Sequence, residues 1–290
     1  MKKKPVFIIG AGRSGTKFLR DILAASPEVV RVPYDIGYLW RYGNEGLNHD
    51  EIDPDSVSRK SIRWMRKKLP KLIDRSVYKP DASILVEKSV PNALRPRLLY
   101  RAFPEATFVH LVRDGRAVTE SAMRMWRTPP ERHYLMDKIR YFPWGNIRYA
   151  IWYVCNRAFG KVKNSPAVWG PRYRGIENDI QYESLHVVCA KQWFHCVRVA
   201  SEQLATIPQD QVVSVRYEDI MVGTESLTTL CEKLGIDPDP VVRRHEEMLR
   251  PGENEKWRRS LTPEQINDIH SVFKALPESI KDWVFSEKAS

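Results

Sequence analysis

A short stretch near the start of the chain combines residue types that suit the binding of an anion. It supplies three glycines, two hydroxyls and two cations, namely Gly10, Gly12, Arg13, Ser14, Gly15, Thr16 and Lys17. Glycines let backbone N–H groups come close to a ligand, while hydroxyls donate hydrogen bonds and cations neutralise negative charge. These types at this spacing favour a site for a phosphate-sized anion.

The elements expected on either side of this stretch support the same interpretation. Residues 6–9 form an unbroken apolar run, which is typical of a strand buried on both faces. Phe18, Leu19, Ile22 and Leu23 follow at helical spacing. A strand, a glycine-rich turn and a helix N-terminus in this order direct several N–H groups to one point.

One familiar loop of this kind is the P-loop of nucleotide triphosphatases, G-x-x-x-x-G-K-[ST]. Gly10 and Gly15 have its spacing, but Thr16 and Lys17 stand in the reverse order. The one-residue shift moves the ammonium group to another side of the helix start. The loop therefore favours an anion other than ATP–Mg, and a nucleotide kinase with a degenerate P-loop stays an alternative.

A second group of residues suits another phosphate-sized anion. Arg113 follows a strand expected at residues 107–112, and Ser121 lies two turns along the helix that Gly115 and Arg116 open. An arginine and a hydroxyl placed in this way can converge on one anion. The alternative is a surface ion pair between Asp114 and Arg116 at a helix start.

The composition limits which partners and which location we expect for the protein. The chain has 47 basic and 36 acidic residues, a net charge of +11, which implies nucleic acid, an anionic surface or a highly charged cofactor as a partner. A basic amphipathic helix expected at residues 56–74 leaves a nucleic-acid-binding module as an alternative, although no reader motif accompanies it. No apolar run reaches about 18 residues, so no membrane span is expected. The basic start reads as a first strand, and we expect a cytoplasmic protein.

The order of the elements predicts the fold. Strands expected at residues 6–9, 84–86, 107–112 and 212–216 alternate with helices at 94–103, 117–126, 181–205 and 225–234, and two or three helices close the chain. This order indicates an α/β, three-layer, P-loop-like fold with a central, mostly parallel sheet flanked by helices. We expect one domain over residues 1–290, with an insertion rich in aromatic residues and Arg at about 127–178. Because ligands sit beyond the carboxyl ends of parallel strands, the loop, Glu87–Lys88, Arg113–Asp114 and Tyr217–Glu218 should share one edge.

Taken together, the motifs resemble the sulfotransferases that use 3′-phosphoadenosine 5′-phosphosulfate (PAPS), in particular their bacterial and Golgi-type branch. RSGT in the loop is similar to the family's 5′-phosphosulfate loop, and Arg113 with Ser121 matches its 3′-phosphate motif. EKSVPNALR resembles E-K-[ST]-P with an added Val90, VRYEDIM resembles V-R-Y-E-D-L, and GENEKWRRSLTPEQ resembles a cofactor-covering loop with a Lys-Trp pair. WGPRYRGI is similar to a segment of the same branch. The likeness runs from residue 5 to about 261.

The resemblance implies an enzyme that moves a sulfuryl group from PAPS to an acceptor hydroxyl, with a saccharide favoured as acceptor. It implies adenosine 3′,5′-bisphosphate (PAP) as the product and no metal. It would also explain the basic balance without nucleic acid. The cofactor-binding residues that it implies are Gly12, Arg13, Ser14, Gly15, Thr16, Lys17, Arg113, Ser121, Tyr217, Lys256 and Trp257.

For the chemical step, the resemblance points to a carboxylate about twenty residues past the loop. Asp35 falls at or beside that position, one methylene shorter than the family's Glu. Lys88 or Lys17 would donate to the bridging oxygen. Glu87 and His110 are the rival bases, although Glu87 is expected to orient Lys88, and a histidine inside a strand is more often part of the core. Aromatic residues that could line an acceptor pocket, or form core, are Trp126, Tyr134, Tyr141, Trp144, Tyr149 and Trp152.

Overall fold

The structure is a computed structural model that describes residues 3–74, 76, 79–128, 168–250, 252 and 254–285. Most of the insertion expected at 127–178 lies outside these residues. Of the aromatic residues expected at an acceptor pocket, only Trp126 is among the described ones. The single-domain boundary and the insertion therefore stay predictions.

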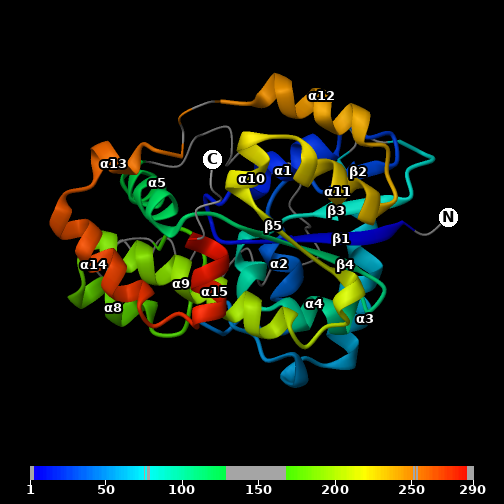
Figure 1. Cartoon of the computed structure of the whole chain (residues 1–290). Helices are drawn as coiled ribbons and strands as arrows, with labels where there is room; N and C mark the ends of the chain where they lie inside the picture. Colours follow the sequence, from blue (N-terminus) through cyan, green and yellow to red (C-terminus); the bar gives the residue numbers. More distant parts are fainter. Residues whose placement is uncertain are drawn as a thin grey trace.

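The strands form one sheet in the order β2-β3-β1-β4-β5 (Figure 1). The strands are β1 (Lys4–Ile9), β2 (Val29–Arg31), β3 (Ile84–Glu87), β4 (Thr107–Val112) and β5 (Val212–Arg216). All pairings among the described residues are parallel, so the expected mostly parallel sheet is confirmed and is all-parallel. Every strand therefore ends at the same edge, which we call the carboxyl edge.

Helices cover both faces of this sheet, because alternate strand residues enter separate cores. Val6 and Ile8 pack in one core, and Phe7 and Ile9 in the other. The first core is closed by α1 (Thr16–Leu23), α10 (Tyr217–Val222), α11 (Glu225–Leu234) and α12 (Pro238–Met248). The second is closed chiefly by α2 (Gly37–Trp40), α3 (Arg59–Lys68), α4 (Pro96–Ala102), α5 (Gly115–Arg127) and α9 (Leu185–Leu204). This arrangement is the expected three-layer fold.

The remaining helices lie beside α5 and α9 in Figure 1. They are α8 (Ile176–Tyr182), α13 (Trp257–Ser260), α14 (Pro263–Phe273) and α15 (Glu278–Phe285). Trp257, Phe273 and Val284 from these helices join the second core. None of the helices in the described residues is long and apolar enough to cross a membrane.

Several predicted boundaries differ from the observed ones. The helix expected at 181–205 is two helices, because Glu183 and Ser184 adopt extended backbone between α8 and α9. The helix expected at 56–74 is shorter, because the Ser58 hydroxyl caps α3 by accepting from the Ser61 amide (3.1 Å), and Pro70 falls in a separate 3₁₀ turn. Strand β2 was not predicted, and four helices follow α11 in the described residues where two or three were expected.

Candidate active site

The candidate anion-binding loop, residues 10–17, lies at the carboxyl edge and joins β1 to α1. Arg13 and Gly15 have left-handed backbone, with φ of 71° and 86°, and the Ser14 amide donates to the Ala11 carbonyl at 3.2 Å. Left-handed residues in such a turn direct neighbouring amides toward one concavity. The Ser14 hydroxyl is 1% exposed and has no hydrogen-bond partner among the described residues. A buried polar atom without a partner is rare, and at a helix N-terminus it suits a bound anion.

Two glycines let the loop pack tightly against the ends of neighbouring strands. A Cβ on Gly15 would lie 2.4 Å from the ring of Tyr217, the residue that follows β5. A Cβ on Gly12 would lie 3.3 Å from Trp169 and 3.4 Å from Val90, which comes shortly after β3. The loop therefore packs against the segments that follow β3 and β5.

The two anion-binding groups expected from the sequence meet at Arg13. The Arg13 Nε donates to the Ser121 hydroxyl at 2.9 Å, and Arg113 donates to the Arg13 carbonyl at 3.0 Å. The Arg113 carbonyl in turn accepts from the indole N–H of Trp193 at 3.1 Å. Because α9 carries Trp193, the long helix fixes the backbone where β4 ends.

A residue that sequence reasoning missed also fixes Arg113. The Asn254 side chain accepts from Arg113 Nε at 2.8 Å and donates to Glu218 at 3.2 Å. Glu218 also accepts from the Asp114 amide at 2.9 Å. The Arg113 guanidinium lies 4.4 Å over the Tyr217 ring. The resemblance of the segment around Asn254 to a cofactor-covering loop was the only sequence signal for this contact.

The Lys-Trp pair of that segment opens α13. Trp257 is 5% exposed, and two guanidinium groups contact its ring, with the Arg116 group 4.3 Å and the Arg258 group 4.7 Å from the ring centroid. The cation–π contact with Arg116 holds this indole at the start of α5. Lys256 is exposed.

Two candidate catalytic residues, far apart in the sequence, meet at the carboxyl edge. Lys88 Nζ lies 2.8 Å from an Asp35 carboxylate oxygen. Lys88 follows β3, and Asp35 lies between β2 and α2, so the pairing of β2 with β3 brings them together. The Lys88 side chain is 10% exposed and that of Asp35 is 26% exposed. The carboxylate is thus the more accessible partner.

The other two candidates for proton or leaving-group chemistry have different surroundings. Lys17 is 73% exposed and pairs with Asp21 at 3.0 Å, one turn further along α1. His110 lies inside β4, opposite Ile9 and Ser214 in the strand register, and is 4% exposed. Burial lowers the pKa of His110 to about 4, so it is neutral at pH 7.

Glu87 is the last residue of β3 and is 1% exposed. It accepts hydrogen bonds from the Ser89 hydroxyl, from the Asn92 side chain at 3.0 Å and from the Trp40 indole at 3.4 Å. Lys88 pairs with Asp35, and the expected orienting bond from Glu87 to Lys88 is not among the hydrogen bonds of the described residues. Burial raises the pKa of Glu87 to about 7.

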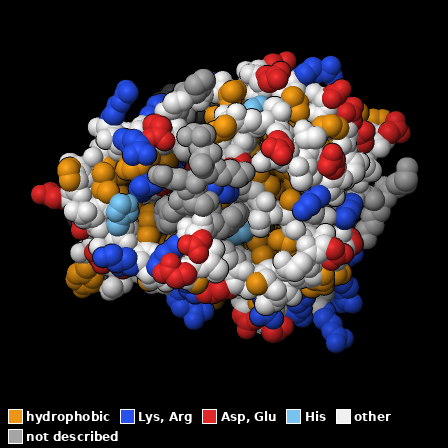
Figure 2. Space-filling view, in the orientation of Figure 1, with side chains coloured by type: hydrophobic (Ala, Val, Ile, Leu, Met, Phe, Trp, Pro, Cys, Tyr) orange, Lys and Arg blue, Asp and Glu red, His pale blue; other side chains and the backbone are white. Residues whose placement is uncertain are grey.

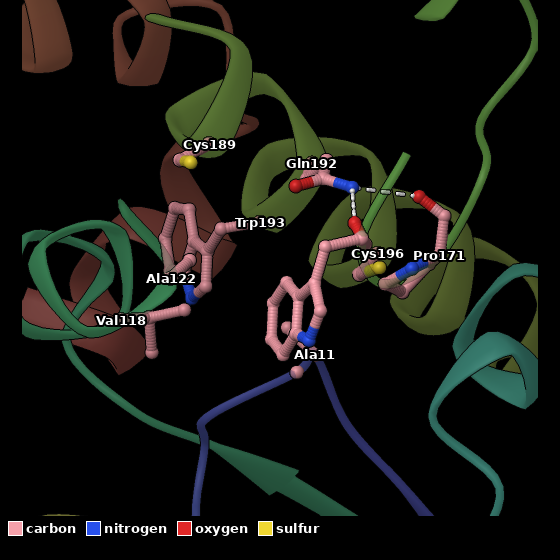
Figure 3. Close-up of a pocket in the computed structure, with 10 residues that line it drawn as sticks. Ala11, Val118, Ala122, Pro171, Cys189, Gln192, Trp193 and Cys196 are labelled. Carbon is pink, nitrogen blue, oxygen red and sulfur yellow. Dashed lines mark hydrogen bonds between the residues drawn. The ribbon is translucent and has the colours of Figure 1, made fainter. Parts of the chain in front are cut away.

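A small apolar pocket lies beside the loop (Figure 3). It is lined by Ala11, Gly12, Val118, Ala122, Trp169, Pro171, Cys189, Gln192, Trp193 and Cys196. The Gln192 amide group donates to the carbonyls of Trp169 (2.8 Å) and Pro171 (2.9 Å) and accepts from the Trp126 indole (3.2 Å). Gln192 therefore ties the segment that carries Trp169 to α9. Within the described residues, no group of three or more His, Cys, Asp and Glu could hold a metal ion.

Comparison with known proteins agrees with this geometry. Residues 5–144 match the family described as the sulfotransferase family. The solved structures that are similar to this chain include the sulfotransferase domain from the olefin synthase of Synechococcus PCC 7002, with 19% identity and a TM-score of 0.51, covering 96% of this chain and 98% of that one. A comparison with curated protein sequences gives no match.

Two further sulfotransferase structures share the fold. STF9 from Mycobacterium avium has 11% identity and a TM-score of 0.52, and the match covers 94% of this chain and 76% of that chain. Mouse SULT7A1, solved in complex with PAP, has 14% identity and a TM-score of 0.51, and the match covers 98% of this chain and 90% of that chain. At these identities the likeness shows the fold, and the match over residues 5–144 is a similarity of that part of the chain to the sulfotransferase family. Residues 5–144 of the chain are thus similar to the sulfotransferase family, and the chain shares the fold of solved sulfotransferases.

Proposed function

We propose that this enzyme transfers a sulfuryl group from PAPS to a hydroxyl of a carbohydrate acceptor, with Asp35 as the base. The observation that carries the proposal is the Lys88–Asp35 ion pair of 2.8 Å, at the same sheet edge as the loop. In that loop the Ser14 hydroxyl is buried and has no hydrogen-bond partner in the described part of the chain. One feature suits an anion, and the other suits proton transfer beside it.

The residues at the carboxyl edge fit the two charged ends of PAPS. The amides of the loop, the Ser14 hydroxyl and the N-terminus of α1 suit the 5′-phosphosulfate. Arg113, Ser121 and Arg13 suit the 3′-phosphate, since Arg113 is already fixed by Asn254 and by the Tyr217 ring. When bound, PAPS supplies the sulfuryl group, and PAP is the leaving group.

The ion pair supplies the two remaining functions. Asp35 accepts the proton of the acceptor hydroxyl, and its exposure of 26% leaves room for that hydroxyl. Lys88 donates a hydrogen bond to the bridging oxygen, where negative charge develops. Lys17 is a weaker candidate for the Lys88 role, because it is 73% exposed and engaged by Asp21.

Two features support a carbohydrate as acceptor. The segment of residues 169–176 is similar to one in Golgi-type sulfotransferases. Aromatic side chains, which stack well on sugar rings, lie close to the loop: Trp169 is in van der Waals range of Gly12, and Trp126 contacts the same segment through Gln192. A screen of carbohydrate acceptors with sulfur-labelled PAPS tests this class, and labelling of phenols in place of sugars would contradict it.

The base is tested with Asp35→Asn, which keeps the shape of the side chain and removes the proton acceptor. We expect turnover to fall about a hundredfold or more, with PAP affinity retained. Asp81→Asn, on an exposed turn before β3, is the matched control. If Asp35→Asn stays active while Glu87→Gln is inactive with cofactor bound, Glu87 is the base.

Ligand specificity separates this proposal from a nucleotide kinase. PAP should raise the thermal stability of the protein, because two anion-binding groups hold it, whereas ATP should raise it much less. The exposed position of Lys17 supports this expectation, since a kinase loop needs its lysine at the phosphates. Equal stabilisation by ATP, dependent on Mg²⁺, would favour the kinase.

A further inference from the structure

A buried series of hydrogen bonds begins at the backbone next to Asp35. The amide of Ile36 donates to the Ser89 hydroxyl at 2.8 Å, and that hydroxyl donates to Glu87 Oε1. The Trp40 indole, at the end of α2, donates to the same oxygen at 3.4 Å. Glu87 therefore holds the chain on the C-terminal side of Asp35 at two points, through the Ser89 hydroxyl and through the Trp40 indole.

The other Glu87 oxygen continues the series away from the ion pair. The Asn92 side chain donates to Glu87 Oε2 at 3.0 Å, and its own oxygen accepts from Arg95 Nε at 3.0 Å. Because the Asn92 oxygen is engaged by Arg95, its NH₂ group must face Glu87. Arg95 then donates to Asp50 at 3.3 Å.

Asp50 joins the series to the segment that carries Trp169. Its carboxylate accepts from the Arg172 amide at 2.9 Å and from Arg41 at 2.9 Å, and its own amide donates to the Arg172 carbonyl at 2.6 Å. Trp169, three residues before Arg172, lies against Gly12 of the loop. The series thus extends from Asp35 to the segment beside the anion-binding loop.

Stability alone does not account for these residues. Glu87, Asn92, Arg95, Asp50 and Arg41 are each at most 5% exposed, so two carboxylates and two guanidinium groups are buried together. Removing such charges from water costs several kcal/mol per ion, and apolar residues of similar volume are often at least as stabilising. What this network provides is a fixed geometry, since directional hydrogen bonds join Glu87, Asn92, Arg95 and Asp50 in series.

We infer that Glu87 is a positioning residue, which through Ser89 fixes the backbone at Asp35 and through Asn92, Arg95 and Asp50 fixes the Trp169 segment against the loop. The inference rests on the proposed role of Asp35 in sulfuryl transfer. It assigns Glu87 no contact with substrate or cofactor.

The charge state of Glu87 offers an independent readout. Three donors face it, from Ser89, Asn92 and Trp40, and the charged groups that act on it are Asp35 and Lys88. Only the carboxylate accepts from all three donors, and burial raises its pKa to about 7. Below that pH a protonated Glu87 no longer fits its donors, so the network weakens.

The test uses Glu87→Gln and Ser89→Ala in the full chain, with Glu105→Gln as a control. Glu105 is a partly exposed carboxylate that pairs with Arg66, just before β4 begins.

We measure kcat with the carbohydrate that the screen identifies, PAP affinity, and hydrogen exchange of the Ile36 amide. Both variants should lower kcat, by about tenfold for Glu87→Gln and a few-fold for Ser89→Ala, with PAP affinity within twofold. Exchange at Ile36 should be at least tenfold faster, and the fall of kcat below pH 7 should disappear in Glu87→Gln and persist in Glu105→Gln.

Other outcomes are decisive as well. Unchanged kcat and unchanged Ile36 exchange in Ser89→Ala overturn the inference, and this variant serves even where Glu87→Gln fails to fold. Loss of all activity in Glu87→Gln, with Ile36 exchange unchanged in both variants, makes Glu87 a direct participant and also overturns it. Absence of sulfuryl transfer by the unaltered enzyme contradicts the proposed function instead, and the exchange measurement then still decides whether Glu87 fixes the backbone.

Discussion

The chain has two basic regions, the carboxyl edge and helix α3, and they hold their charges differently. At the carboxyl edge Arg113 and Lys88 are 8% and 9% exposed, and each is fixed by side-chain contacts. Residues 59–71, which comprise α3 and the turn after it, contain seven Lys and Arg and no Asp or Glu. Arg59, Lys60, Arg63 and Lys67 on this helix are exposed.

The two regions also lie at opposite edges of the sheet. Arg66 of α3 donates to the Ala102 carbonyl and pairs with Glu105, two residues before β4 begins. Arg113 follows the other end of β4, and a six-residue strand spans about 20 Å. Figure 2 shows blue side chains gathered at the lower right, where Figure 1 has α3.

This difference corrects one expectation from the composition. The cofactor was expected to explain the basic balance, yet seven of the net eleven positive charges come from residues 59–71, away from the loop. Net charge is therefore a poor guide to this site. Cations that are buried and held by neighbouring side chains can form a specific binding site, whereas exposed cations on a helix are solvated and mobile.

The largest expected effect is on turnover, from the fixed cation Lys88. Lys88→Met should lower kcat about a hundredfold or more, because it removes the proposed donor to the bridging oxygen and the ion-pair partner of Asp35. Lys67→Met, an exposed cation of α3, is the matched control and should leave kcat unchanged. Equal effects in steady-state assays would remove the distinction between the two regions.

The next effect is on cofactor affinity, from Arg113. Arg113→Ala removes a charge-assisted contact worth about 1.5–3 kcal/mol, so PAP should bind about tenfold or more weakly by calorimetry. Adenosine 5′-phosphosulfate, which lacks the 3′-phosphate, should lose much less. If the affinity for adenosine 5′-phosphosulfate falls as much as that for PAP, Arg113 does not bind the 3′-phosphate.

A smaller effect concerns the stability of the loop. Gly15→Ala forces a residue with a side chain into left-handed backbone and against the Tyr217 ring, so unfolding free energy should fall by more than about 1–2 kcal/mol. Gly175→Ala is the control, since Gly175 has a similar φ of 98° and open space around it. Denaturant unfolding should show the greater loss for Gly15→Ala, and equal losses would mean that Tyr217 moves aside.

The smallest effect is expected from α3. The triple variant Arg63→Gln, Lys67→Gln and Lys71→Gln should change PAP affinity less than twofold at physiological salt. About 20 Å separates the two edges, and the screening length is about 8 Å. A tenfold loss of affinity would show that α3 acts on the proposed cofactor site.

Much of the fold followed from local patterns. β4, β5 and α11 have the predicted bounds, because continuous apolar runs mark the strands and Gly235, with φ of 69°, ends the helix. β2 was missed because it has three residues, too few for periodicity, and exists through its pairing with β3. The insertion carries no clear period, and most of it lies outside the described residues.

The site was less predictable, since its contacts join distant parts of the chain. The loop could be predicted from the sequence, because its glycines and hydroxyls lie within seven consecutive positions. The contacts between distant residues could not be predicted. Asn254 and Arg113 are 141 residues apart in the sequence, and Asp35 and Lys88 are 53 apart. The motif led us to expect that Glu87 would orient Lys88, which follows it in the sequence. In the structure Glu87 ends β3 and accepts from Asn92 and Trp40, whereas Lys88 donates to Asp35.

The position of β1 has a consequence for how this chain reaches its fold during synthesis. Lys4 pairs with Ile84 of β3, and Val6 pairs with Thr107 of β4. About a hundred further residues must therefore be synthesised after β1 before both of its neighbouring strands exist. At translation rates of about 5–20 residues per second, that interval is about 5–20 s. During it the apolar run of residues 5–9 has unpaired edges and is prone to aggregate. The lysines at positions 2–4 flank the run with charge, as gatekeeper residues do, and so protect the nascent strand that later carries the loop.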